Sequence, residues 1–496
     1  MIGDKNMSIT NPYSAGTANS KLFRIPAILT LKSGRILACG DVRYGNGTDD
    51  PANIETALRY SDDNGATWSD VIFVNSFEDM EHADHNKAIP KSASFCDSAI
   101  CEAENNVIYH MCDACPAFMG LWSAGTYGKG SGYIDGKLSL CDKTSADKAE
   151  STTLDKAHYP YYVGDFVESG FAPVLKHSDN TLYNNYYVDK SYYIYTKAEG
   201  GFIPVTVKQM NKDGSLNNKD VHANVFFAYA PIKIYPTYYL WMKKSTDGGE
   251  TWSDAKIINN QVESSGFTGF APGRGITVNA NGKTRVLFAI YDNNSRTEYT
   301  SAIYTEDGGE TWHRSEKANK VGFAGKSSET QFVLMNNNII RMYSRNIAGY
   351  ISYCDSKDFG ETWGEYTLDK ALKYCSNCMV SFINYSKEIE GKKAIVASYP
   401  SRKIRKSGVI RIGLFGEDNK VEWKYRKNVT NSLNPFDFVY SCLTEDALGN
   451  ILDLYESDKA EFTLKAYPLE ELLVKESGKL SLINSIKSKY YNATRK

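Results

Sequence analysis

The sequence predicts an all-β protein. Its aromatic content is high, with 35 Tyr, 21 Phe and 7 Trp, and many short segments alternate apolar and polar residues, as in 284–292, 392–399 and 408–415. Turns rich in Gly, Asn and Asp separate these segments, a pattern typical of antiparallel sheets. Helical periodicity is convincing only in PLEELLVKE, residues 468–476.

Length and charge limit the classes of protein. A chain of 496 residues suits one large repetitive fold or two to three ordinary domains. A formal net charge of −2 gives no bulk attraction to nucleic acid or to anionic membranes. No apolar run reaches the roughly 18 residues that span a bilayer, and MIGDKNMSITNPYS at the N-terminus lacks the apolar stretch of a signal peptide.

The cysteines and histidines do not indicate a metal site. Ten cysteines are too sparse for a disulfide scaffold. Cys112–Cys115 and Cys375–Cys378 have CxxC spacing, but neither has a second pair nearby, so we interpret them as buried thiols. His82 and His85 in EHADHN are interpreted as loop residues. We expect no metal and no cofactor.

A short motif, S/T-x-D-x-G-x-T-W, occurs at 61–68, 245–252, 305–312 and 356–363, and each copy follows a strand-like stretch. We interpret it as a hairpin turn in which Asp accepts backbone N–H bonds, Gly takes a positive φ, and Thr fixes the returning strand. Four of the seven tryptophans lie in these motifs, where they can fill the gap between neighbouring sheets. The aspartates are therefore structural rather than catalytic.

These motifs resemble the Asp-box repeats of sialidases, in which each box joins the third and fourth strands of a β-propeller blade. FRIP, residues 23–26, resembles the signature that opens a sialidase catalytic domain. The resemblance covers most of 21–465 and implies a six-bladed β-propeller. The last three boxes are spaced as single four-stranded blades would be. The first interval is about three times as long, so it holds blades without a box, an inserted module, or both.

The predicted division of the chain follows from this interval. Residues 142–236 contain aromatic-rich stretches such as NNYYVDKSYYIY, and we interpret them as a small inserted β-rich subdomain. The propeller then comprises 21–141 and 237–467, preceded by an N-terminal lead-in, 1–20. A partly helical tail, 468–496, follows.

An arginine in the apolar run 21–29 needs a reason, because guanidinium groups are rarely buried unpaired. The innermost strand of a blade has an unpaired edge, which tolerates Pro26. Side-chain alternation places Arg24 and Pro26 on the side opposite Phe23 and Ile25. Arg24 can then reach out at the end of the blade.

The resemblance implies three arginines that grip the carboxylate of sialic acid. Arg24 is the first, and Arg345, at the end of the segment that begins GKSSETQF, is the second. ASYPSRKIRKSGVIRI contains the third, for which Arg405 is favoured over Arg402. Glu456 in LDLYESD matches the glutamate that braces the first arginine. Guanidinium suits this task because it binds carboxylates with two parallel hydrogen bonds.

The resemblance also implies the catalytic groups. Tyr440 in FVYSCL matches the nucleophile and Glu329 matches its base. A neutral phenol avoids the repulsion that a carboxylate would meet at a carbon bearing a carboxylate, but it needs a base because its pKa is near 10.

The segment GDVRYGNGTDDPANIETALRY implies the remaining groups of the site. Arg43 matches a further substrate-binding arginine, and Asp49, favoured over Asp50, matches the acid/base. Asp97 in SFCDSAI matches an aspartate that lines the pocket near O4 of the sugar.

We therefore expect an exo-α-sialidase that hydrolyses terminal sialic acids with retention, through a tyrosyl-glycosyl intermediate. Alternatives are a trans-sialidase, an intramolecular trans-sialidase, a glycan-binding propeller without catalysis, and a propeller glycosidase for neutral polysaccharides. The partners expected are sialylated glycoproteins, glycolipids or oligosaccharides, with no nucleic acid and no membrane span. The substrate class favours an extracellular or cell-surface location, and we expect a monomer.

Overall fold

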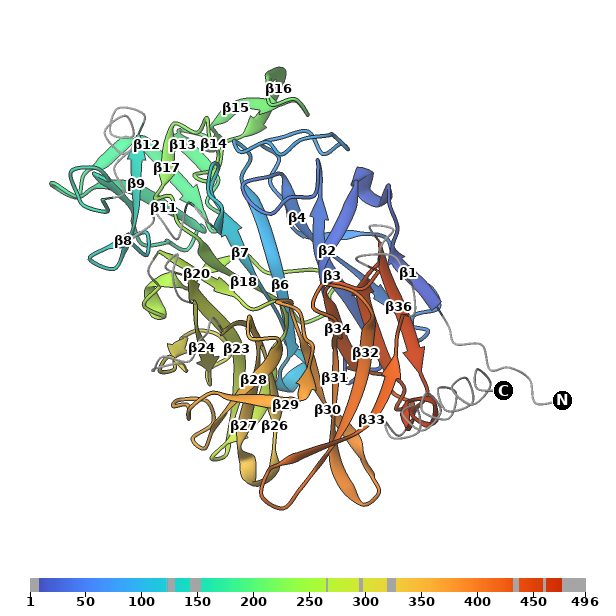
Figure 1. Ribbon diagram of the computed structural model, residues 1–496. Helices are drawn as coiled ribbons and strands as arrows, with labels where there is room; N and C mark the ends of the chain where they lie inside the picture. Colours follow the sequence, from blue (N-terminus) through green and yellow to red (C-terminus); the bar gives the residue numbers. More distant parts are fainter. Residues whose placement is uncertain are drawn as a thin grey trace, which may run out of the picture.

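The structure is a computed structural model that describes residues 9–121, 123, 130–142, 153–264, 266–293, 298–318, 327–430, 437–457 and 461–474. Six antiparallel sheets are arranged as the blades of a β-propeller (Figure 1). The prediction of an all-β, six-bladed propeller is confirmed. No helix in the described ranges is long and apolar enough to cross a membrane.

The strands of each blade follow one another from the channel outward. The first blade contains β2 (Leu22–Thr30), β3 (Ile36–Arg43), β4 (Ile54–Ser61) and β5 (Ile72–Asn75). The second contains β6 (Ser94–Glu102), β7 (Ile108–Cys115), β18 (Tyr239–Ser245) and β19 (Lys256–Ile257), with β21 (Gly273–Arg274) added in parallel to β6. The third contains β20 (Phe267–Phe270) and β22 (Ile276–Ala280), which both pair with β23 (Lys283–Asn293), then β24 (Glu298–Thr305) and β25 (His313–Arg314).

The other three blades complete the ring. The fourth contains β26 (Ser327–Leu334), β27 (Ile340–Asn346), β28 (Tyr350–Ser356) and β29 (Thr367–Lys373). The fifth contains β30 (Ser381–Ile389), β31 (Lys392–Pro400), β32 (Gly408–Phe415) and β33 (Val421–Asn428). The sixth contains β34 (Ser441–Glu445), β35 (Ile451–Glu456), β36 (Phe462–Tyr467) and β1 (Ile9–Tyr13).

Strand β1 closes the propeller. It pairs antiparallel with β36, so the first described strand of the chain is the outermost strand of the last blade. The sequence reading of 1–20 as a lead-in missed this role, because ITNPY is short and contains a proline. The convincing helical pattern at 468–476 yields only α3 (Leu469–Leu472), and its continuation from residue 475 lies outside the described residues. Short 3₁₀ turns occur at Thr17–Asn19, Glu104–Asn106, Asn259–Gln261 and Asn336–Asn338.

Each repeated motif joins the third and fourth strands of a blade, namely β4 to β5, β18 to β19, β24 to β25 and β28 to β29. In the first, Asp63 accepts hydrogen bonds from the backbone N–H and the hydroxyl of Thr67, at 2.8 and 2.6 Å. Trp312 is buried between the second and third blades, against Tyr109 and Phe288. The motifs therefore have a structural role: they fix the turn within a blade and pack against the neighbouring blade.

The long first interval holds an insertion inside the second blade, between β7 and β18. Its main sheet contains β8 (Tyr133–Ile134), β9 (Lys137–Asp142), β10 (Tyr161–Val163), β11 (Phe171–Lys176), β12 (Leu182–Asp189), β13 (Ile194–Ala198), β14 (Gly201–Pro204) and β17 (Ile232–Ile234). A hairpin of β15 (Thr206–Met210) and β16 (Leu216–His222) accompanies it. Since β8 and β9 pair within this sheet, we propose that the insertion spans 116–238 rather than 142–236.

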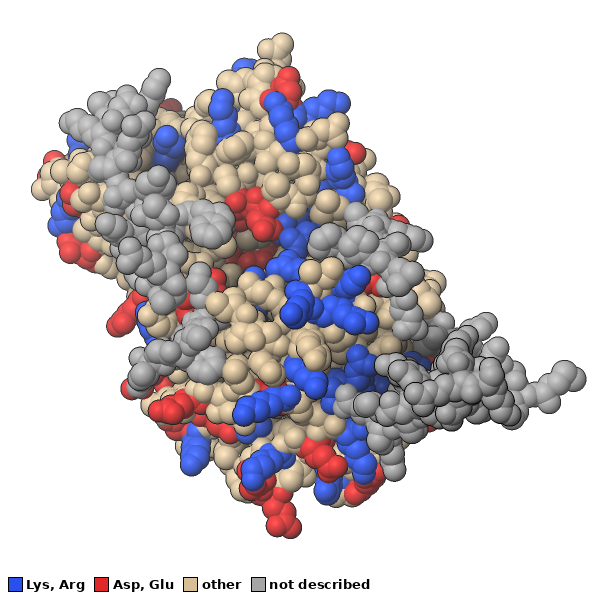
Figure 2. All heavy atoms as spheres, viewed as in Figure 1, with Lys and Arg blue, Asp and Glu red and all other residues tan. Residues whose placement is uncertain are grey.

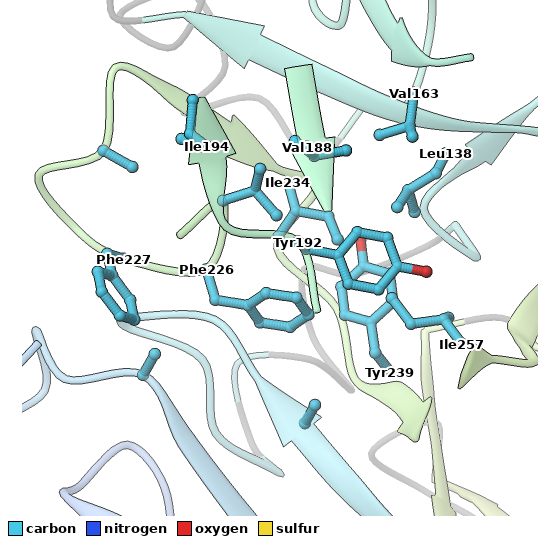
Figure 3. Close-up of a cluster of buried hydrophobic side chains, with 14 of the residues drawn as sticks. Leu138, Val163, Val188, Tyr192, Ile194, Phe226, Phe227, Ile234, Tyr239 and Ile257 are labelled. Atoms are coloured by element: carbon cyan, nitrogen blue, oxygen red, sulfur yellow. The ribbon is translucent and has the colours of Figure 1, made fainter. Parts of the chain in front are cut away.

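A hydrophobic core joins the insertion to the propeller. Val188 and Ile194 of the inserted sheet belong to one buried cluster with Tyr239 of β18 (Figure 3). Trp241 of β18 belongs to the same cluster. In Figure 1 the inserted strands, in cyan and green, lie beside β7 and β18 of the second blade.

Strand β2 is the edge strand predicted for the FRIP run, because among the described strands it pairs with β3 alone. The predicted alternation fails after Arg24. Ile25 has φ of 60° and the register shifts between Arg24 and Ala27. As a result Pro26 is buried like Ile25, instead of sharing the partly exposed side of Arg24. This bulge re-aims the backbone beside the pocket described next.

Candidate active site

A pocket of about 140 Å³ lies at one end of the propeller, where the inner strands begin. Its lining residues are Arg24, Ile25, Arg43, Asp49, Asp50, Cys96, Asp97, Leu121, Tyr238, Phe267, Tyr291, Glu298, Ser328, Glu329, Arg345, Arg405 and Tyr440. In Figure 2, acidic and basic side chains meet around a hollow near the middle of the visible face. All predicted site residues except Glu456 line the pocket, and Glu456 lies directly behind Arg24.

Three arginines from different blades converge here. Arg24 Nε lies 3.2 Å from Oε1 of Glu456, which also accepts the backbone N–H of Ile25 at 2.8 Å. The guanidinium carbons of Arg24 and Arg405 each lie 5.2 Å from the centroid of the Tyr440 ring. Arg345 donates to the Tyr440 hydroxyl at 2.9 Å. Their charges therefore face one small volume.

Tyr440 and Glu329 form a buried pair. The Tyr440 hydroxyl donates to Oε1 of Glu329 at 2.5 Å, and Oε2 of Glu329 lies 2.8 Å from NH1 of Arg345. Burial raises the pKa of Tyr440 well above its ordinary value, with Arg345 opposing the rise and Glu329 adding to it. The phenol is thus held neutral, next to a carboxylate that can accept its proton.

Asp49 and Asp50 point to different partners. Asp49 Oδ1 lies 2.6 Å from NH1 of Arg43 and 3.3 Å from NH1 of Arg24, and its side chain is 72% exposed. Desolvation by the neighbouring pocket wall opposes ionisation, but Arg43 and Arg24 outweigh it and lower the pKa of Asp49 to about 2. Asp50 instead accepts hydrogen bonds inside the protein, from Ser94, Cys96, Cys115 and Tyr238.

Arg43 is fixed by a residue that the sequence reading missed. Asp41 Oδ2 accepts from Nε and NH2 of Arg43 at 3.2 and 2.8 Å, while its Oδ1 accepts the backbone N–H of Asp97 at 3.1 Å. Asp97 has φ of 62° at a bulge in β6 and lines the pocket. Burial, then Asp41 and Asp113, raise its pKa well above the ordinary value. Asp41 could have been suspected, since it precedes Arg43 by two positions on one strand face.

Asn377 is a second residue that the sequence did not indicate. Its side-chain oxygen accepts from Nε of Arg345 at 2.7 Å, and its backbone oxygen accepts from NH2 of Arg405 at 3.0 Å. It lies inside one of the two CxxC stretches, where attention falls on the cysteines. Tyr238, at the end of the insertion, was missed because it lies in the aromatic run YPTYY, where no single tyrosine stands out. Arg402 is exposed and does not line the pocket.

The thiols near the pocket are engaged in hydrogen bonds. All ten cysteines are free and buried. Within the described ranges, Asp50, Cys96 and Cys115 have ligand atoms within 4.8 Å of one another, as do Cys96, Asp97 and Asp113. The thiols of Cys96 and Cys115 donate to Oδ2 of Asp50 at 2.9 and 3.2 Å. Such protonated thiols are poor metal ligands.

The sequence of the chain is similar to one family model and to several known proteins. Residues 25–421 match the family model described as BNR repeat-like domain. The chain is 32% identical over 488 residues to sialidase B of Streptococcus pneumoniae and 30% identical over 504 residues to anhydrosialidase of Macrobdella decora. These matches cover 92% and 94% of this chain. The chain spans 66% and 63% of the length of these two relatives, slightly under two thirds.

Among solved structures, the intramolecular trans-sialidase of Ruminococcus gnavus, in complex with oseltamivir carboxylate, superposes with a TM-score of 0.81 at 30% identity. The match covers 96% of this chain and 100% of that chain.

Proposed function

The chain belongs to the sialidase family, and we propose that it removes terminal sialic acids from glycoconjugates through a covalent intermediate on Tyr440. The observation that carries the proposal is the buried contact between the Tyr440 hydroxyl and Glu329, surrounded by guanidinium groups from three blades.

The arginines suit the carboxylate of the substrate. Arg24, Arg345 and Arg405 bring three cations to one pocket, and each charge-assisted hydrogen bond contributes about 1.5–3 kcal/mol. Neutral polysaccharides offer no anion to such a cluster. A purely glycan-binding propeller would have no use for a phenol held against a carboxylate. Both alternatives are therefore less well supported.

The first chemical step uses Tyr440 and Glu329. The phenol oxygen attacks the anomeric carbon while Glu329 takes its proton, and the bond from the anomeric carbon to the leaving oxygen breaks. Asp49 donates a proton to that oxygen. Arg345, within reach of both the phenol and Glu329, stabilises the negative charge that develops.

Asp49 must carry a proton to act as the acid, yet its pKa is about 2 in the empty pocket. Substrate binding raises this pKa. The carboxylate of the substrate competes with Asp49 for Arg24 and adds negative charge beside it, and both effects raise the pKa of Asp49. We infer that binding and protonation of Asp49 are coupled.

The second step returns the enzyme to its starting state. In hydrolysis, Asp49 removes a proton from water, the water oxygen bonds to the anomeric carbon, and the bond to Tyr440 breaks as its proton returns from Glu329. Two inversions give net retention. A hydroxyl of the sugar itself can replace the water, which gives an anhydro sugar. The names of two similar proteins, anhydrosialidase and intramolecular trans-sialidase, favour this second candidate.

The experiment is incubation with 3′-sialyllactose followed by NMR and mass spectrometry of the sialic acid product. A hydrolase gives free sialic acid, first as the anomer retained from the substrate. An intramolecular transferase gives a product lighter by one water. Absence of any released sialic acid from this and from aryl sialosides would contradict both.

We further propose that the enzyme acts as a monomer on extracellular or cell-surface glycans.

A further inference from the structure

The loop that carries Asp49, residues 44–53, joins β3 to β4 and lies on a segment to which the proposed mechanism gives no role. This supporting segment, residues 76–93, connects β5 to β6. Tyr44, at the start of the loop, is buried. Its ring stacks on the ring of His82 in the supporting segment, with the centroids 4.9 Å apart and 10° between the planes.

His82 also contacts the strand that follows the loop. Its Nε2 lies 3.2 Å from Oε1 of Glu55, on β4, and 2.9 Å from the backbone oxygen of Phe77. Glu55 is fully buried, and buried carboxylates need a partner. Burial opposes protonation of His82, but Glu55 outweighs it and raises the pKa of His82 to about 9. A charged imidazolium therefore lies between Tyr44, where the loop starts, and Glu55, just after the loop ends.

Two further contacts join the loop to the supporting segment. Gly45 has φ of 95°, and a Cβ at this position would lie 2.5 Å from the backbone oxygen of Lys87. At the other end of the loop, the side chain of Asn53 donates to the hydroxyl of Ser92 at 2.9 Å. Both ends of the loop are thus in contact with the supporting segment, and Asp49 lies between them.

The insertion holds the supporting segment from its other side. The backbone N–H of Met210, on β15, donates to the backbone oxygen of Asp79 at 2.8 Å, and its own oxygen accepts the N–H of Glu81 at 2.9 Å. Met80, Ile89 and Met210 form a small buried cluster. The supporting segment therefore offers the loop a surface that is fixed on both sides.

We propose that His82 is a positioning residue that, through Tyr44 and Glu55, holds Asp49 where it can protonate the leaving oxygen. The inference rests on the role proposed for Asp49. Loss of the imidazolium would leave Glu55 buried without this cation and Tyr44 without the ring on which it stacks, so the loop would shift. A shift of about 1 Å in a catalytic group can reduce a rate about 100-fold. The arginines that bind the substrate carboxylate are held by other residues, so kcat should fall and KM should change little.

The kinetic test compares 3′-sialyllactose with an aryl sialoside, whose leaving group needs no proton. His82→Gln should lower kcat for sialyllactose about ten- to 100-fold, and kcat for the aryl sialoside less than about threefold. His82→Arg should recover most of the loss, because a guanidinium is a flat cation that can pair with Glu55 and stack on Tyr44. Equal losses on both substrates, or no loss in His82→Gln, would overturn the proposal.

His158→Gln is the matched control. His158 pairs with Asp155 at 2.7 Å in the insertion, and 26% of its side chain is exposed, against 25% for His82. We expect kcat of His158→Gln to stay within about twofold of wild type on both substrates. If His158→Gln shows the same contrast between substrates as His82→Gln, the effect does not come from the loop and the proposal fails.

Crystal structures of wild type and His82→Gln test the position of Asp49 without reference to activity. We expect the contact of Asp49 with Arg43 to be lost in the variant alone. An unmoved Asp49 would overturn this proposal and leave the proposed function standing. Wild type that releases no sialic acid from either substrate would contradict the proposed function itself, and with it this role of His82. If His82→Gln does not fold, Glu55→Gln removes the same ion pair, and the same contrast and displacement are expected of it.

Discussion

The hydroxyl of Tyr440 lies 2.5 Å from Oε1 of Glu329, at the floor of a pocket edged by arginines. The two residues are separated by 111 positions in the chain, so the contact exists only because the fourth and sixth blades face the same channel. Tyr440→Phe removes the attacking oxygen and little else. We expect turnover to fall by at least about 10³-fold, while an unsaturated sialic acid analogue still binds. Turnover near the wild-type level would remove Tyr440 from the mechanism.

Glu329→Gln keeps the shape of this pair but removes the base. Turnover should fall by about 10²–10⁴-fold. The phenol can no longer lose its proton to the side chain, so the loss should shrink at alkaline pH as the phenol ionises by itself. A pH profile of kcat measures this, and a loss that is constant with pH would contradict the role.

The assignment of the third arginine predicts a contrast between two neighbours. Arg405 faces Tyr440, whereas Arg402 is exposed. Arg405→Ala should raise KM by about ten- to 150-fold, the loss of one charge-assisted hydrogen bond of about 1.5–3 kcal/mol. Arg402→Ala should leave KM within about twofold. Steady-state kinetics on both variants decide this, and the reverse result would transfer the assignment to Arg402.

Asp49 and Asp50 offer a matched pair for the acid. Asp49→Asn should reduce turnover of sialyllactose by about 10²–10⁴-fold, and that of an aryl sialoside much less, because a phenolate leaves without a proton. Asp50→Asn breaks hydrogen bonds from two thiols and a tyrosine, so it should lower Tm and affect both substrates alike. If Asp50→Asn alone shows the dependence on leaving group, Asp50 is the acid.

The contact between Asp41 and Arg43 predicts an indirect effect of Asp41 on proton donation by Asp49. It fixes Arg43, which in turn holds Asp49. Asp41→Asn should therefore reduce turnover of sialyllactose about tenfold more than that of the aryl sialoside. A fold-wide disturbance would lower both equally. Measuring the two substrates on one preparation, with Tm recorded beside them, separates the explanations.

The sequence predicted what depends on local contacts. The repeated motif could be recognised in the sequence because its hydrogen bonds are local: Thr67 donates to Asp63, four positions earlier in the chain. The edge position of the FRIP strand could be predicted because an edge strand tolerates both an arginine and a proline. The resemblance then allowed residues far apart, such as Arg24 and Tyr440, to be placed in one site. Their proximity could not be derived from spacing alone.

Contacts that cross blades without a motif were missed. Asn377 positions two arginines through a loop of the fourth and fifth blades, and nothing in CSNC distinguishes it from an ordinary turn. The earlier edge that we propose for the insertion could not be predicted from the sequence, because β9 alternates apolar and polar residues as blade strands do. Bulges at Ile25 and Asp97 break the period-two pattern, and a β-branched residue such as Ile25 gives no indication of a positive φ.

The proposed mechanism requires that Tyr440 bonds covalently to the sugar. Incubation with a fluorinated sialic acid bearing a good leaving group should slow breakdown of the intermediate, so that digestion and mass spectrometry can locate the adduct. We expect one sugar per chain, on the peptide containing Tyr440, and no label in Tyr440→Phe. A label on a carboxylate, or rapid turnover of a natural sialoside with no label on Tyr440, would contradict it.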